Sequence, residues 1–146
     1  MSDFRTLSDT MLASPQIGLD EVAKAAEEGV TLIVNNRPDG ESPDEPQGDV
    51  IESAARAAGM EYLAIPVGHS GFSLPQVDAL AEAIKATDGK VLAYCRSGTR
   101  STLLWALARA RLGDAPAEIA IAAQQAGYDI SAVRPTVDML AGEASD

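Results

Sequence analysis

The stretch Lys90–Ala110, KVLAYCRSGTRSTLLWALARA, decides the fold that the sequence predicts. It begins with Val91–Tyr94, a short apolar run of β-forming residues, and the only cysteine of the chain, Cys95, follows directly. Beyond the next few polar residues, leucines recur at helical spacing without an internal glycine or proline. We therefore predict a strand, a tight loop and a helix, with a thiol at the carboxyl end of the strand.

The loop after Cys95 has the composition of an anion-binding site. A loop that closes onto a helix N-terminus points several backbone N–H groups into one concavity, where the helix dipole adds positive potential. Gly98 permits backbone conformations that a side chain would forbid. One arginine precedes it and another follows it. The residues predicted to line this anion site are Arg96, Ser97, Gly98, Thr99, Arg100 and Ser101. Because such surroundings favour a thiolate, Cys95 is predicted to be a nucleophile, although a lone cysteine at a strand end is more often an inert core residue.

Composition limits the classes of protein. The chain has 146 residues, of which 46% are hydrophobic and 23% charged, as expected for one soluble globular domain over 1–146 with a polar tail from about residue 142. A formal net charge of −11 argues against nucleic acid or an anionic membrane as a partner. One cysteine and one histidine favour neither a disulfide nor a metal site, and no cofactor is predicted. The sequence shows no signal peptide or transmembrane run, so the cytoplasm is the expected location.

Short apolar runs alternate with amphipathic segments along the chain. The predicted strands lie within 4–13, 30–34, 62–67 and 91–94, and the predicted helices within 19–29, 50–59, 73–88, 99–110, 116–126 and 133–140. This alternation is typical of βαβ units and predicts a single α/β domain whose mainly parallel sheet is covered by helices on both faces.

Further candidate site residues follow two other predicted strands. The loops after these strands should lie at the same edge of the sheet as the Cys95 loop, where open α/β sheets place their sites. Arg37 is a candidate for anion binding, and Asp39, Glu41 and His69 are candidates for a general acid. A solvated surface loop is the alternative for residues 35–48, and an exposed side chain is the alternative for His69.

Three segments together resemble a known family, the phosphatase-like domain of the beta-lactamase hydrolase-like proteins. They are Val34–Glu41 (VNNRPDGE), Tyr62–Val67 (YLAIPV) and Tyr94–Ser101 (YCRSGTRS). This family is similar in fold to dual-specificity and protein tyrosine phosphatases, and the resemblance covers the chain from about Phe4 to Ala110. It implies a compact domain with a central four- to five-stranded sheet, Cys95 as nucleophile and Arg100 holding the anion.

Two departures from the phosphatase pattern leave the chemistry open. Only four residues separate Cys95 from Arg100, one fewer than the phosphatase signature has, and the shorter loop resembles that of rhodanese-type sulfurtransferases. Gly68-His69-Ser70 stands where dual-specificity phosphatases place an aspartic general acid. The first hypothesis is a cysteine-dependent phosphatase acting on a small phosphoester or a phosphoprotein. The alternatives are a sulfurtransferase that carries a Cys95 persulfide and takes a small sulfur donor, and a non-catalytic domain that binds an anion or senses redox state. The sequence does not indicate the oligomeric state.

Overall fold

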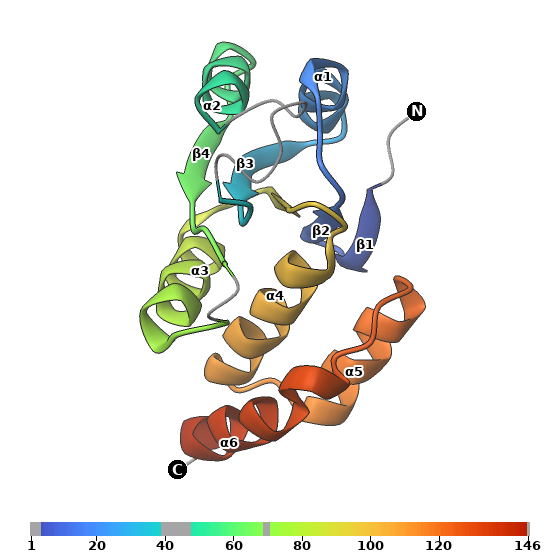
Figure 1. Ribbon diagram of the computed structural model, residues 1–146, viewed down its shortest axis with the longest axis vertical. Helices are drawn as coiled ribbons and strands as arrows, with labels where there is room; N and C mark the ends of the chain where they lie inside the picture. The colour runs from blue at the N-terminus through green and yellow to red at the C-terminus, as the bar shows by residue number, and fades with distance from the viewer. Residues whose placement is uncertain (1–3, 39–47, 69–70, 146) are drawn as a thin grey trace.

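The computed structural model describes residues 4–38, 48–68 and 71–145, and within them a sheet lies between two layers of helices (Figure 1). The strands are β1 (Arg5–Ser8), β2 (Met11–Ser14), β3 (Val30–Asn35), β4 (Glu61–Ala64) and β5 (Lys90–Tyr94). The helices are α1 (Leu19–Glu27), α2 (Gly48–Ala57), α3 (Leu74–Ala86), α4 (Thr99–Arg111), α5 (Pro116–Gln125) and α6 (Arg134–Ser145), and a 3₁₀ turn, η1 (Ser131–Val133), precedes α6.

The sheet has the strand order β1-β2-β5-β3-β4 and is parallel from β2 to β4, with β1 antiparallel at one edge. The strand β5 lies in the middle, where Tyr94 is opposite Ser14 of β2 and Asn35 of β3. Parallel neighbours require crossover connections, which the intervening helices supply. The predicted α/β domain with a mainly parallel sheet is confirmed, and five strands form the sheet within the described residues.

The two faces of the sheet bury separate apolar clusters. Along β5, Leu92 and Tyr94 belong to the cluster that α1 and α2 cover, whereas Val91 and Ala93 belong to the larger cluster beneath α3, α4, α5 and α6. Figure 1 shows the same division, with α1 and α2 on one side of the sheet and the other helices on the opposite side. Successive side chains of a strand point to opposite faces, so a strand buried on both faces is apolar throughout.

Helix α4 is the centre of the larger layer. It packs against α3, α5 and α6, and it also contacts β2 and β5. Trp105 is 4% exposed and Leu104 is fully buried, which places the tryptophan in the core. A helix that is surrounded by others is apolar on most of its faces. Its N-terminus, directly after the Cys95 loop, is therefore held in a fixed position relative to the sheet.

Two boundaries differ from the sequence prediction. A strand was predicted over 62–67, but β4 ends at Ala64; proline has no N–H to extend the ladder at Pro66. The backbone N–H groups of Ile65 and Val67 still donate to the carbonyls of Asn35 and Asn36, both at 2.9 Å, so this segment stays beside the end of β3. The polar tail predicted from about residue 142 is instead the last turn of α6, which continues to Ser145.

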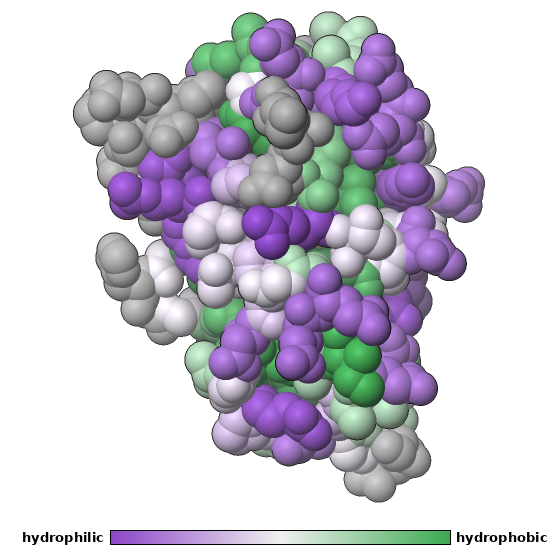
Figure 2. Space-filling model, turned by 90° about the vertical axis from the view of Figure 1, so that its right-hand side faces the viewer, coloured by the Kyte–Doolittle hydropathy of each residue, from purple (hydrophilic) through white to green (hydrophobic). Residues whose placement is uncertain are grey.

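The face of the molecule seen in Figure 2 is mostly hydrophilic, and its apolar side chains lie in small separated areas. This agrees with a chain in which most large apolar side chains are buried in the two clusters. In the part of the chain that the structure describes, no helix is long and apolar enough to cross a membrane.

Candidate active site

Cys95 lies at the carboxyl end of the central strand. Its backbone N–H donates to the carbonyl of Ser14 at 3.3 Å, which continues the pairing of β5 with β2 by one residue. Its side chain has no exposed surface. The thiol therefore lies beneath the loop that leads into α4, between the ends of β2 and β3.

The loop after Cys95 carries backbone donors beside the thiol and at the N-terminus of α4. Gly98 has φ = +92° in the left-handed region and is the N-cap of α4, and its N–H donates to Sγ of Cys95 at 3.1 Å. The backbone N–H groups of Arg96, Ser97 and Ser101 have no acceptor within the described part of the chain. A hydrogen bond to sulfur and a helix N-terminus both stabilise a thiolate, and free N–H groups at such a terminus are available to an anion.

The loop hydroxyls maintain its shape. Ser97 Oγ donates to Thr99 Oγ1 at 3.0 Å and accepts from the N–H of Thr99 at 3.3 Å, so the Ser97 side chain covers the start of α4. Thr102 Oγ1 donates to the Gly98 carbonyl at 2.9 Å. Both Ser97 and Thr99 were predicted to bind the anion, and the structure places their hydroxyls against each other while the Ser97 N–H stays available.

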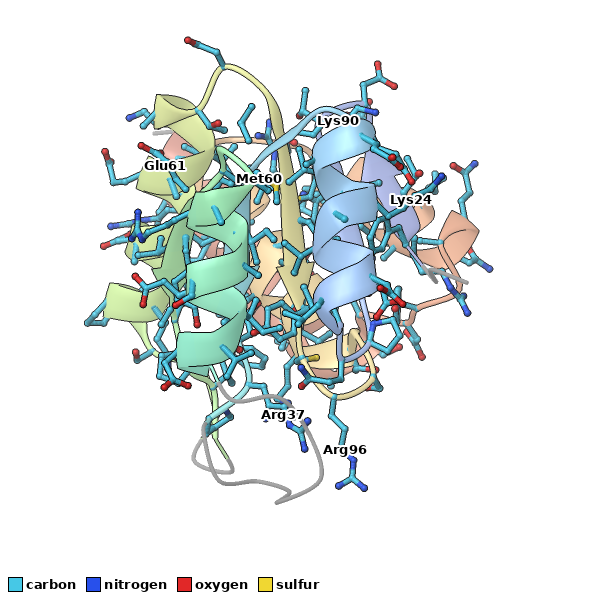
Figure 3. The ribbon with its side chains drawn as sticks, turned by 90° about the horizontal axis from the view of Figure 1, so that it is seen from above. Lys24, Arg37, Met60, Glu61, Lys90 and Arg96 are labelled. Atoms are coloured by element: carbon cyan, nitrogen blue, oxygen red, sulfur yellow. The ribbon has the colours of Figure 1, made fainter. Side chains whose placement is uncertain are left out.

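Three arginines lie around this loop. Arg100 extends from the first turn of α4 to the segment after β4, where its Nη1 donates to the Val67 carbonyl at 2.8 Å. Arg37, after β3, is 6% exposed and donates from Nη1 to Gln16 Oε1 at 2.7 Å, whereas Arg96 is exposed. Arg37 and Arg96 project from the end of the sheet where the parallel strands have their carboxyl ends, and Lys90, the first residue of β5, lies at the opposite end (Figure 3). The site thus carries positive charge in a chain whose formal net charge is −11.

The three general-acid candidates, Asp39, Glu41 and His69, lie outside the described residues. Of the predicted site residues, the structure describes Arg37, Cys95, Arg96, Ser97, Gly98, Thr99, Arg100 and Ser101 and brings them to one edge of the sheet.

The sequence prediction missed residues that build the site from other segments. Gln16, after β2, donates its N–H to the Arg96 carbonyl at 3.3 Å and accepts from Arg37 through Oε1. Asn36 accepts from Ser101 Oγ at 2.8 Å and donates from Nδ2 to the Ile65 carbonyl at 2.9 Å. For Asn36 a signal existed, because a polar amide directly after a buried strand needs partners. No pattern in the sequence pointed to Gln16.

Replacing Asn36 with alanine is expected to lower the free energy of unfolding by about 2–3 kcal/mol, because it leaves the buried Ser101 hydroxyl without its acceptor and the Ile65 carbonyl without its donor. Urea unfolding measures this change. Ser8→Ala is the control. It removes an exposed hydroxyl that lies 3.5 Å from Thr10 Oγ1 and accepts from the Thr10 N–H at 3.3 Å, and because these bonds are exposed to solvent it should change stability by less than about 0.5 kcal/mol. Equal stability of the two variants would show that the Asn36 network contributes nothing.

The fold and the site together define a class of protein: a cysteine-based, phosphatase-like α/β domain with its thiol between a central parallel strand and a buried helix. The comparisons with known proteins specify the family. The family model for the phosphatase-like domain of the beta-lactamase hydrolase-like proteins matches residues 3–112, and the chain belongs to this family.

Curated relatives are similar to this chain over about two thirds of its length. The beta-lactamase hydrolase-like protein of Xylella fastidiosa strain Temecula1 is 39% identical over 101 residues, and that of Agrobacterium fabrum is 35% identical over 101 residues. Each match covers 69% of this chain but 23% of the relative, so the chain spans less than a quarter of the length of these proteins.

Solved structures confirm the fold. A putative phosphatase from Neisseria meningitidis is 30% identical with a TM-score of 0.82, covering 96% of this chain and 99% of that chain. A putative phosphatase from Shewanella putrefaciens, 23% identical over 99% of this chain and 90% of that chain, has a TM-score of 0.73 and supports the fold alone. The predicted resemblance to this family and to phosphatase folds is therefore confirmed.

Proposed function

We propose that this domain hydrolyses phosphoesters through a Cys95 thiolate. The observation that carries the proposal is the hydrogen bond from the Gly98 N–H to Sγ of Cys95 at the N-terminus of α4. In this proposal the contact stabilises the ionised nucleophile, and the N–H groups of Arg96, Ser97 and Ser101, which have no acceptor among the described residues, bind the phosphate. The substrate class is a small phosphoester or a phosphoprotein, since no described feature attracts a nucleic acid to a chain of net charge −11.

The reaction has two steps. In the first, Sγ of Cys95 attacks phosphorus, an S–P bond forms, the ester P–O bond breaks, and the leaving oxygen takes a proton from a general acid. In the second, a water oxygen attacks phosphorus and gives a proton to the conjugate base of the general acid, the S–P bond breaks, and inorganic phosphate leaves as the thiolate is restored. Arg100 and the loop N–H groups balance the charge on the phosphoryl oxygens in both steps. Because Cys95 is fully buried, attack requires a local opening of the segments around it.

Three residues are candidates for the general acid: Asp39, Glu41 and His69. The variants Asp39→Asn, Glu41→Gln and His69→Gln test the three candidates one at a time. The variant that lacks the general acid is expected to hydrolyse an alkyl phosphate about 10²–10⁴-fold more slowly, because an alkoxide is a poor leaving group without a proton. An aryl phosphate with a stable phenolate leaving group should be slowed much less. Measuring kcat/KM for both esters in each variant identifies the acid. If all three variants keep wild-type rates on the alkyl ester, none of these residues is the acid.

Transfer of sulfane sulfur is the second candidate function. The observation that favours it is the short loop, with four residues between Cys95 and Arg100, around a thiol whose sulfur already accepts an N–H. In that reaction Sγ would attack the outer sulfur of thiosulfate, forming an S–S bond and releasing sulfite. An acceptor thiolate would then remove the sulfur and restore Cys95.

A side-by-side turnover assay of the wild-type protein tests the proposal. One arm contains an aryl phosphate, and the other contains thiosulfate with a thiol acceptor. Rapid quenching with mass spectrometry then identifies the group on Cys95. Phosphate release with a phosphoryl group on Cys95 is the expected result. Sulfur transfer without phosphate release would replace the proposal with the second candidate, and no turnover in either arm would favour a domain that only binds anions or senses redox state.

A further inference from the structure

Tyr128 lies against the Cys95 loop from a distant part of the chain. It follows α5 and lies beyond residues 3–112, the part of the chain that the family model matches. Its hydroxyl donates to the Ser97 carbonyl at 3.2 Å. The contact with the next residue is also close, because a Cβ on Gly98 would lie 2.2 Å from the Tyr128 hydroxyl oxygen and 3.0 Å from Cζ.

One peptide group connects this hydroxyl to the thiol. The carbonyl that accepts from Tyr128 belongs to Ser97, and the N–H of the same peptide unit belongs to Gly98 and donates to Sγ of Cys95 at 3.1 Å. A hydrogen bond to a peptide carbonyl polarises the peptide and strengthens its N–H as a donor. The two bonds also fix the direction of this peptide, because a flip would break both.

Contacts with the end of α5 and with Arg5 restrain Tyr128. Its backbone N–H donates to the Ala123 carbonyl at 2.9 Å at the end of α5. The Arg5 guanidinium lies 5.9 Å from the centre of the Tyr128 ring, and Nη1 of Arg5 donates to the Ala126 carbonyl at 3.0 Å. A cation near an aromatic ring and a hydrogen bond to the neighbouring turn restrain the ring together.

We propose that Tyr128 is a positioning residue for the nucleophile: through the Ser97–Gly98 peptide, its hydroxyl stabilises the Cys95 thiolate. The proposal rests on the proposed function only in taking Cys95 as the reactive group, and it is the same for phosphoryl and sulfur transfer. No local pattern predicts this contact, since Tyr128 and Ser97 are 31 residues apart.

Other charged groups near the loop are unchanged by a substitution at Tyr128. Within the described residues they are Arg96 on the loop, Arg100 on α4 and Arg37 after β3, and Arg5 of β1 lies beside the Tyr128 ring. Next to Tyr128, the exposed Asp129 accepts from the hydroxyl and the N–H of Ser131, and these bonds lower the pKa of its carboxyl group. Asp129 therefore stays ionised at neutral and alkaline pH.

The pH dependence of Cys95 alkylation by iodoacetamide in Tyr128→Phe tests the proposal. Since Cys95 is the only cysteine, alkylation reports on it alone. The midpoint is expected to move to higher pH by about 0.5 unit, because the thiolate loses part of its stabilisation. The plateau rate at high pH reports access to the thiol and should change little. Thr31→Val, which removes a hydroxyl hydrogen bond to Thr87, is the control and should keep the wild-type midpoint.

Turnover is a second readout. In Tyr128→Phe, kcat for an aryl phosphate should fall about threefold, with KM changed less, since the anion-binding N–H groups remain. An unchanged midpoint with a higher plateau rate would overturn the proposal and assign Tyr128 to loop packing alone. Because alkylation requires no turnover, a protein that alkylates as expected but releases no phosphate would keep this inference while the proposed function fails.

Discussion

Cys95→Ser is expected to lower phosphate release from an aryl phosphate by at least about 10⁴-fold in kcat. A serine hydroxyl is not ionised at neutral pH, and the described residues place no carboxylate or imidazole in hydrogen-bond contact with this position. Orthovanadate binding should persist, because the proposed mechanism assigns anion binding to backbone N–H groups and Arg100, and the substitution leaves these groups in place.

Phosphate release and vanadate titration on the same preparation measure the two effects. Retained binding shows that the variant is folded, so loss of turnover then reports on chemistry. Comparable turnover in wild type and Cys95→Ser would assign the hydrolysis to another group. Loss of vanadate binding together with loss of turnover would show that the thiol also maintains the loop, because Sγ accepts a hydrogen bond from the Gly98 N–H.

Gly98→Ala is expected to be the most damaging substitution that leaves every catalytic side chain present. At φ = +92° a side chain is strained, and the new Cβ would lie 2.2 Å from the Tyr128 hydroxyl oxygen and 3.3 Å from the Ser14 carbonyl carbon. The free energy of unfolding should fall by about 3 kcal/mol, and kcat/KM should fall by at least about 100-fold, because the loop must shift to relieve the overlap.

Gly59→Ala is the matched control. Gly59 has φ = +87°, but nothing lies within 4 Å of a Cβ built there, so this variant has the backbone strain without any steric overlap. It should lose about 1–2 kcal/mol of stability and keep wild-type kcat/KM. Adding Tyr128→Ala to Gly98→Ala should recover part of the stability, since it removes the closest overlap. If Gly98→Ala loses no more stability and activity than Gly59→Ala, the close packing of the loop has no functional role.

Much of the fold was predictable from local patterns. The apolar run Val91–Tyr94 is the central strand because it is buried on both faces, and the leucines after it define the buried side of α4. The end of β4 shows the limit of such patterns. Apolar residues continue to Val67, yet Pro66 has no N–H and the strand ends before it, although the segment remains bonded to the end of β3.

The candidate site divides in the same way. The sequence alone determined the Cys95 loop, because a strand, a glycine at a helix N-cap and the first turn of the helix are contiguous and local geometry orients their N–H groups. The tertiary structure decided what surrounds the loop. Hydrogen bonds join Gln16 to the Arg96 carbonyl, Asn36 to the Ser101 hydroxyl and Tyr128 to the Ser97 carbonyl. Asn36 and Ser101 are 65 residues apart, and their contact depends on β5 pairing with β3. Such contacts follow from strand order and helix packing, which depend on the burial of the whole chain and have no local signature.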